Sequence, residues 1–187
     1  MLHKPFSALL IDHDDSFTQN LKWWLSQKFS TEIISSPQLA AFSSAQKFDL
    51  IVFSAGPKSP KDYSHSLNWL ATNSTTPTLG ICLGLQMMTL AEHGIVSPYQ
   101  PVRHGKTSQL VFKNEKIKES FPVARYHSLE CLPIKAFQTI AVSNDDQKLM
   151  WAEHQSKPWM GWQFHPESFL TQDQGFLINY LENWVRR

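Results

Sequence analysis

The sequence predicts an α/β fold with a mixed, mostly parallel central sheet flanked by helices and an antiparallel region in the second half. Two observations support this prediction. Up to about residue 93, short apolar runs alternate with segments of helical apolar spacing, which is typical of a parallel sheet covered by helices on both faces. From about Ile95, prolines, turn residues and short strand-like pieces replace this alternation and favour antiparallel pairing.

In the first half, strands are expected at 8–11, 31–34, 50–53 and 78–81, of which 8–11 and 50–53 are apolar runs. Helices are expected after Asp15, at 38–46, near 63–72 and at 85–93. The first helix has its apolar side chains at helical spacing and is expected to be capped by Asp15 or Ser16. These apolar residues are Phe17, Leu21, Trp24 and Leu25.

In the second half, strands are expected at 110–112, 139–143, 149–153 and 159–163. The chain closes with an amphipathic helix whose apolar face comprises Phe176, Leu177, Tyr180, Leu181 and Trp184. The sequence shows no internal repeat, low-complexity tract or linker. A single domain over residues 1–187 is therefore predicted.

Composition narrows the functional class. With 42% hydrophobic and 18% charged residues the chain is an ordinary globular protein, and a net charge of +1 argues against a nucleic-acid-binding surface. Residues 63–91 carry no charge, but the polar segment 73–77 divides them into pieces too short for a membrane span. Two distant cysteines and no signal-peptide pattern predict a cytoplasmic protein in which one thiol is free to act as a nucleophile.

A cysteine lies between two glycines where a predicted strand meets a predicted helix. Cys82 occupies the centre of Gly80–Gly84 (GICLG), the cysteine form of the G-x-S-x-G nucleophile elbow. The helix dipole beyond it favours the thiolate over the thiol. The backbone N–H of Leu83 faces the same space and is a candidate oxyanion donor. The pattern predicts that Cys82 is a nucleophile.

A histidine and a carboxylate follow the predicted strand 159–163. Pro166 holds the segment extended, so that His165 and Glu167 project to the same side. A carboxylate in that place can orient the imidazole and stabilise the imidazolium. This is the role of the third group in a nucleophile–base–acid triad.

Together these motifs resemble the triad (class I) glutamine amidotransferases. The resemblance rests on Gly80–Gln86 (GICLGLQ) and His165–Ser168 (HPES), and it extends to Ile11–Leu21 (IDHDDSFTQNL), His104–Ser108 (HGKTS) and Arg125–Leu129 (RYHSL). The last three are similar to the second components of anthranilate synthase and para-aminobenzoate (aminodeoxychorismate) synthase. The similarity covers nearly the whole chain, and the fold it implies is flavodoxin-like.

The resemblance implies roles for particular residues. Cys82 would be the nucleophile, His165 the general base and acid, and Glu167 the orienting acid. Other residues match the family's oxyanion-hole and glutamine-binding positions: Gly56 and Leu83 for the oxyanion, and Gly56, Gln86, Ser128 and Leu129 for glutamine. The implied reaction hydrolyses L-glutamine and delivers ammonia to a chorismate-binding synthase component, without metal or organic cofactor. The pathway, anthranilate or aminodeoxychorismate, stays open.

One position departs from the family pattern. After the third predicted strand the family has Gly-Pro-Gly, whereas this chain has Gly56, Pro57 and Lys58. Lys58 restricts the backbone if φ must be positive, and it places a cation at the mouth of the site, where it either holds the substrate carboxylate or slows turnover. Two rival functions remain: a stand-alone γ-glutamyl thiol hydrolase and a catalytically weak regulatory subunit.

Overall fold

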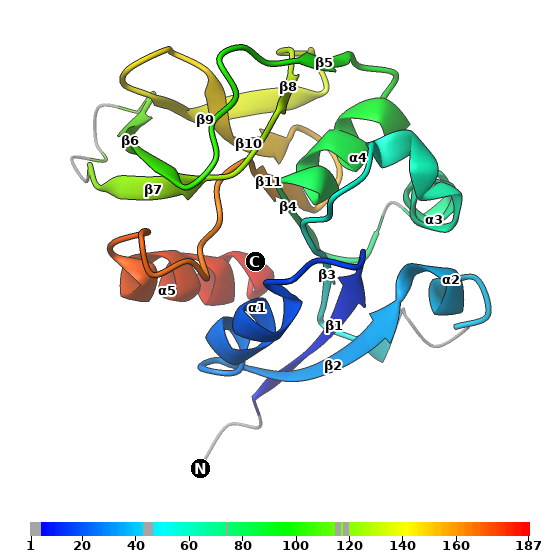
Figure 1. Ribbon diagram of the computed structural model, residues 1–187. Helices are drawn as coiled ribbons and strands as arrows, with labels where there is room; N and C mark the ends of the chain where they lie inside the picture. The colour runs from blue at the N-terminus through cyan, green and yellow to red at the C-terminus, as the bar shows by residue number, and fades with distance from the viewer. Residues whose placement is uncertain (1–4, 43–46, 74, 115–116, 118–119) are drawn as a thin grey trace.

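A single large sheet organises the molecule and changes character half-way across. The computed structural model describes residues 5–42, 47–73, 75–114, 117 and 120–187. Nine strands pair in the order β2-β1-β3-β4-β11-β10-β9-β6-β7, and two further strands, β5 and β8, form a small separate sheet (Figure 1). Pairing is parallel from β2 to β11 and antiparallel from β11 to β7. The predicted division into a parallel and an antiparallel region is confirmed.

The strand bounds follow the apolar runs closely in the parallel half. These strands are β1 (Phe6–Asp12), β2 (Phe29–Ser35), β3 (Leu50–Phe53), β4 (Thr78–Ile81) and β11 (Trp159–Trp162). The antiparallel strands are β6 (Lys106–Phe112), β7 (Pro122–Arg125), β9 (Phe137–Ser143) and β10 (Leu149–His154), and the small sheet pairs β5 (Val96–Pro98) with β8 (Leu129–Cys131). Strands β5, β7 and β8 were not predicted.

Helices cover both faces of the sheet and create two apolar cores. On one face lie α1 (Thr18–Leu25) and α5 (Gln174–Val185); on the other lie α2 (Ser36–Leu39), α3 (Ser64–Thr72) and α4 (Leu83–Ala91), with a short 3-10 helix at Pro60–Asp62 (Figure 1). Successive residues of β1 point alternately into the two cores. Leu10 belongs to the core that contains α1, and Leu9 belongs to the core that contains α4. This alternation is what a strand buried on both faces requires.

Two helix predictions need correction. Helix α1 begins at Thr18 after an N-cap at Phe17, and neither Asp15 nor Ser16 caps it; instead the Thr18 hydroxyl donates to the Asp12 carboxylate at 2.7 Å. The helix expected at 38–46 is a single turn over Ser36–Leu39, because Ser35 and Gln38 form a capping box that starts it earlier. Residues 43–46 of that prediction lie outside the described part of the chain.

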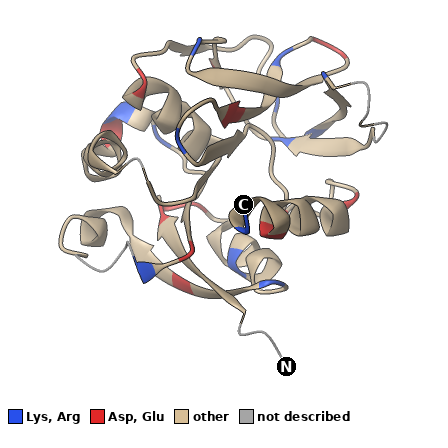
Figure 2. Ribbon diagram, turned by 180° about the vertical axis from the view of Figure 1, so that it is seen from behind, with Lys and Arg blue, Asp and Glu red and all other residues tan. Residues whose placement is uncertain are grey.

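Charge is distributed over many elements. Figure 2 shows lysine and arginine interspersed with aspartate and glutamate along the ribbon, in keeping with the net charge of +1. Among the helices in the described residues, none is both long enough and apolar enough to cross a membrane.

The topology brings four loops to one edge of the sheet. Because β1, β3, β4 and β11 run parallel, their carboxyl ends meet at the same edge. The residues that follow these ends are Asp15, Gly56, Cys82 and His165 respectively. In open α/β sheets this edge is where ligands bind.

Candidate active site

The backbone bends sharply where β4 passes into α4, and Cys82 occupies the bend. Its φ of 49° and ψ of −97° lie outside the regions that residues with side chains normally adopt. Such a conformation persists only where surrounding structure enforces it, and it is common at functional sites. Here the Cys82 N–H donates to the Trp162 carbonyl at 2.7 Å, which ties the bend to the end of β11.

Lack of space accounts for the two glycines that flank the bend. A Cβ added to Gly80 would lie 2.5 Å from the carbonyl carbon of Gly84. A Cβ added to Gly84 would lie 2.5 Å from the carbonyl oxygen of Phe53 in β3. Both obstacles are backbone atoms in a densely packed region, so neither side chain can be accommodated without moving a strand or the helix. Glycine is therefore required on both sides of the bend.

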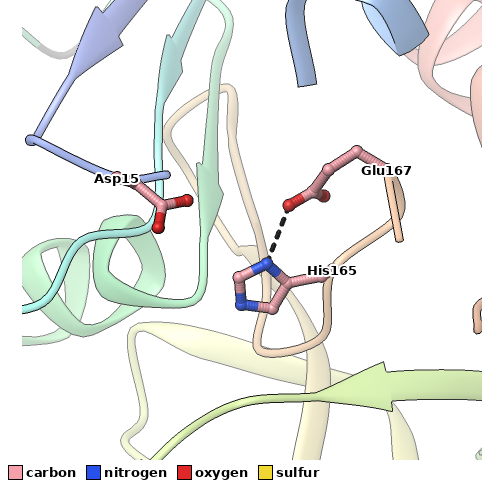
Figure 3. Close-up of side chains that lie close together, drawn as sticks. All are labelled: Asp15, His165 and Glu167. Atoms are coloured by element: carbon pink, nitrogen blue, oxygen red, sulfur yellow. Dashed lines mark hydrogen bonds and ion pairs between the residues drawn. The ribbon is translucent and has the colours of Figure 1, made fainter. Parts of the chain in front are cut away.

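His165 and Glu167 form a bonded pair at the end of β11. The His165 N–H donates to the Ala124 carbonyl at 3.1 Å, which fixes the backbone against β7. The imidazole Nδ1 lies 2.7 Å from Glu167 Oε1, with both side chains buried (Figure 3). Because a carboxylate oxygen accepts, Nδ1 carries a proton and donates it to Glu167, and Nε2 is the ring nitrogen on the opposite side.

Electrostatics favour the protonated imidazole at this position. Burial alone would lower the pKa of His165, but the Glu167 carboxylate and the Cys82 thiol outweigh it and hold that pKa well above the ordinary value. The site therefore stabilises an imidazolium between a carboxylate and a thiol. A group that must accept a proton from sulfur and later donate it to a leaving amine benefits from this environment.

Two adjoining cavities meet at Cys82. The first, of about 250 Å³, is lined by residues from the β3, α4 and β7–β8 segments; the second, of about 220 Å³, is lined by residues from the β1 and β11 loops. Cys82 lines both cavities and His165 lines the second. The thiol sulfur also accepts a hydrogen bond from the Gln163 amide at 3.3 Å. The nucleophile and base expected from the sequence thus border one shared space.

The other sequence-predicted residues surround the first cavity. These are Gly56, Leu83, Gln86, Ser128 and Leu129, and all five line it together with Cys82. Leu83 opens α4, so its N–H lacks an intrahelical partner and is available to an oxyanion. A Cβ on Gly56 would lie 2.7 Å from the His13 carbonyl oxygen, which explains why glycine stands there. At about 250 Å³ the cavity is slightly smaller than typical ligand pockets, which measure about 300 to 1,000 Å³.

Asp15 lies beside the catalytic candidates, a placement that sequence reasoning missed. One ligand atom each of Asp15, His165 and Glu167 lies within 4.8 Å of the other two (Figure 3). Asp14, with φ of 61°, supplies the turn that presents Asp15 to the site. A metal ion held here would compete with the 2.7 Å hydrogen bond between His165 and Glu167. The expectation that the chemistry needs no metal stays a prediction.

A buried arginine network supports the wall of the first cavity, and it too was missed. Arg125 Nε donates to His127 Nε2 at 3.0 Å, so the proton of His127 is on Nδ1 and is donated to the Leu129 carbonyl at 2.8 Å. Arg125 also donates to Asp146 at 2.9 Å. Burial, followed by the Arg125 charge, lowers the pKa of His127 to about 4, which keeps it neutral. The only sequence signal was the motif that contains Arg125 and Leu129.

Comparison with known proteins agrees with this geometry. The profile of the family "Glutamine amidotransferase class-I" matches residues 9–184. The chain belongs to this family. As a class I glutamine amidotransferase it is an enzyme, and the resemblance stated from its motifs is confirmed.

Among curated proteins, this amidotransferase is similar in sequence to components of two synthases. It is 32% identical to "Anthranilate synthase component 2" of Lactococcus lactis, over 96% of this chain and 93% of the relative. The Buchnera aphidicola protein of the same name is 34% identical, over 96% of each chain. "Aminodeoxychorismate synthase" of Streptomyces griseus is 35% identical over 96% of this chain, which spans only 26% of that longer protein.

Solved structures share the fold at lower identity. A glutamine amidotransferase from Thermotoga maritima superimposes with a TM-score of 0.73 at 14% identity, covering 98% of this chain and 96% of the other. A GMP synthase protein from Thermoplasma acidophilum gives a TM-score of 0.82 at 18% identity, with the same coverage. These matches confirm the predicted α/β architecture.

Proposed function

We propose that this amidotransferase is the glutaminase component of a chorismate-using synthase, and that Cys82, His165 and Glu167 form its catalytic triad. The observation that carries the proposal is a thiol on a strained elbow, sharing a cavity with an imidazole that a buried carboxylate holds at 2.7 Å. The names of the relatives support the synthase assignment. The partner would bind chorismate and receive ammonia.

The reaction would proceed through a covalent intermediate. The Cys82 thiolate attacks the side-chain amide carbon of glutamine, and the N–H groups of Leu83 and Gly56 stabilise the oxyanion. Loss of one such donor typically raises the barrier by about 3 kcal/mol. His165 gives a proton to the departing nitrogen, the carbon–nitrogen bond breaks, and ammonia and a glutamyl thioester result. Water, deprotonated by the same histidine, then attacks the thioester and releases glutamate, which restores the thiol.

Glu167 would act on His165 without touching the substrate. Its hydrogen bond to Nδ1 directs Nε2 to the reacting atoms and stabilises the imidazolium. Gln86, Ser128 and Leu129 would hold the amino-acid end of glutamine, since they line the cavity that opens from Cys82. Nε2 of His165, the ring nitrogen not bonded to Glu167, would carry out the proton transfers.

The nitrogen source separates this proposal from its rivals. With a chorismate-binding component and glutamine, we expect Cys82→Ala to abolish product formation, whereas externally supplied ammonia should still support synthesis. Cys131→Ala is the matched control, because that thiol is buried and burial raises its pKa to about 12. Equal loss with both nitrogen sources in Cys82→Ala would contradict the proposal.

The two rival functions predict different activities of the chain, alone and mixed with the synthase component. A stand-alone γ-glutamyl thiol hydrolase would turn over γ-glutamyl peptides rapidly and would not respond to the synthase component. A weak regulatory subunit would release no ammonia from glutamine even when mixed with that component. Testing each chorismate-binding component in turn, and identifying the aminated product, assigns the pathway.

A further inference from the structure

Lys58 is the feature that most clearly separates this chain from the Gly-Pro-Gly pattern of its family. Non-glycine residues of positive φ in the described chain are Asp14, Cys82, His93, Gln147 and Asp173, and Lys58 is absent from this set. The loop after β3 therefore adopts a backbone that an L-residue tolerates at this position. The side chain is accommodated without strain, so its position can serve a purpose of its own.

Lys58 lines the same cavity as Cys82 and Gln86. Among the described residues that line this cavity, Lys58 is the sole lysine or arginine, and no aspartate or glutamate accompanies it. The His127 imidazole in the wall is kept neutral by the lowering of its pKa. The permanent charge that borders the cavity is therefore a single positive one.

The ammonium group of Lys58 is not committed to an ion pair within the described chain. Nζ instead lies over the ring of Tyr63, 6.0 Å from its centroid. Lys148, by contrast, lies 2.7 Å from Glu130, and Lys28 lies 3.0 Å from Glu182. An uncommitted cation at the rim of a cavity without carboxylates attracts an anion.

Glutamine supplies such an anion at the end remote from the reacting amide. When its side-chain amide is at Cys82, its α-carboxylate must lie further along the cavity. We propose that Lys58 is a specificity-determining residue whose ammonium group binds the α-carboxylate of the substrate. This inference rests on the proposed glutaminase function. It adds a charged contact to the neutral positions that the family pattern supplies.

The test combines a variant that lacks the Lys58 charge with a substrate that lacks the α-carboxylate charge. For Lys58→Gln we expect the KM for L-glutamine to rise about threefold to tenfold, with kcat little changed, because Lys58 is exposed and water screens its charge. For the α-amide of L-glutamine, which lacks the carboxylate, wild type and Lys58→Gln should have the same KM, measured as isoglutamine formed. Lys58→Arg should keep most of the affinity for glutamine.

Lys61→Gln is the matched control, since Lys61 is an exposed lysine three residues further on, in the short 3-10 helix, and does not line the cavity. An equal rise of KM for both substrates would overturn the inference, because the effect would then be on loop structure. Unchanged KM with weaker binding of the synthase component would also overturn it, since Lys58 would then contact the partner.

Binding measured without turnover distinguishes failure of this inference from failure of the proposed function. Calorimetric titration of L-glutamine into Cys82→Ala and into Cys82→Ala/Lys58→Gln reports affinity alone. A weaker Kd in the double variant supports the carboxylate contact, and an equal Kd contradicts it. A wild-type protein that binds glutamine but never hydrolyses it with any partner would instead overturn the proposed function.

Discussion

Asp15 and Glu167 place two carboxyl groups beside one imidazole. Burial raises the pKa of Asp15, and the charges of Glu167 and Asp12 raise it further, while His165 opposes them. A carboxyl group whose pKa is higher in the folded state destabilises the fold once the pH exceeds its unfolded pKa. The same charge helps to stabilise an imidazolium at His165. Asp15 is thus expected to favour activity at the expense of stability.

The Asp15→Asn variant tests this trade-off. At pH 7 we expect a higher Tm than for wild type, because a disfavoured charge is removed, and a kcat lower by about twofold to fivefold. The gain in Tm should vanish near pH 3, where Asp15 is protonated in both states. Asp14→Asn is the control, since Asp14 is exposed and asparagine tolerates its positive φ. A variant unchanged in both Tm and kcat would show that Asp15 does not interact with the site.

The site residues that the sequence predicted are those that lie close to one another along the chain. The elbow around Cys82 and the His165–Glu167 pair each lie within a few residues, so local geometry was sufficient to predict them. Asp15 reaches His165 only because β1 and β11 end at the same sheet edge. Its motif was visible, but its local signal was that of a helix cap, which the structure does not contain.

At the scale of elements, the β4–Cys82–α4 elbow depends on close approach of three backbone segments. Gly84 at the start of α4 lies against Phe53 of β3, and Gly80 in β4 lies against Gly84. The elbow therefore holds the nucleophile above the sheet only while these positions lack a side chain.

Two glycine substitutions should act in opposite directions. Gly84→Ala should lower the free energy of unfolding by about 1 to 3 kcal/mol or more and reduce activity, since its Cβ meets the Phe53 carbonyl. Gly175→Ala, in the first turn of α5, meets nothing within 4 Å and should stabilise the protein by up to about 1 kcal/mol. Urea unfolding measures both. A Gly84→Ala protein as stable and active as wild type would contradict the close packing.

Sequence periodicity predicted the elements that are buried on both faces. The runs that became β3 and β4 were found at their full bounds because every residue in them is buried. Strand β8 was missed because its three residues include the partly buried Glu130, and its place depends on pairing with β5. In helix α1, the burial of each tryptophan depends on the face that it occupies. Trp24 faces the core and is fully buried, whereas the adjacent Trp23 is 70% exposed.

At the scale of the whole molecule, two buried histidines make folding depend on pH. Burial lowers the pKa of His13 and of His127 to about 4. His13 lies between the hydroxyls of Ser54 and Ser66, 3.1 and 2.9 Å from its ring nitrogens. The unfolded chain binds protons at these histidines near pH 6.5 and the folded chain does not, so stability falls as the pH drops from about 6.5 towards 4.

A pH series of unfolding measures this effect. Each histidine should contribute up to about 3 kcal/mol of the loss at pH 4. In His13→Asn the free energy of unfolding should therefore decline less steeply between pH 7 and pH 4 than in wild type, whatever its value at pH 7. Parallel curves for the two proteins would show that His13 does not resist protonation in the folded state.

The overall topology was predictable only in part. Alternation of strands and helices indicated the parallel half, and the change of texture near Ile95 indicated the antiparallel half. That both halves join in one sheet through β11, which pairs parallel with β4 and antiparallel with β10, depends on long-range pairing that no local pattern encodes. This junction brings His165 to the cavity that Cys82 lines.

The covalent intermediate is the most direct measure of the proposed mechanism. The enzyme, mixed with its synthase component and L-glutamine, would be quenched in acid within the first turnovers and digested for peptide mass analysis. We expect a glutamyl group on Cys82, lost when Cys82 is replaced by alanine, and none on Cys131. Consumption of glutamine with no adduct on Cys82, or with the adduct on Cys131, would contradict it.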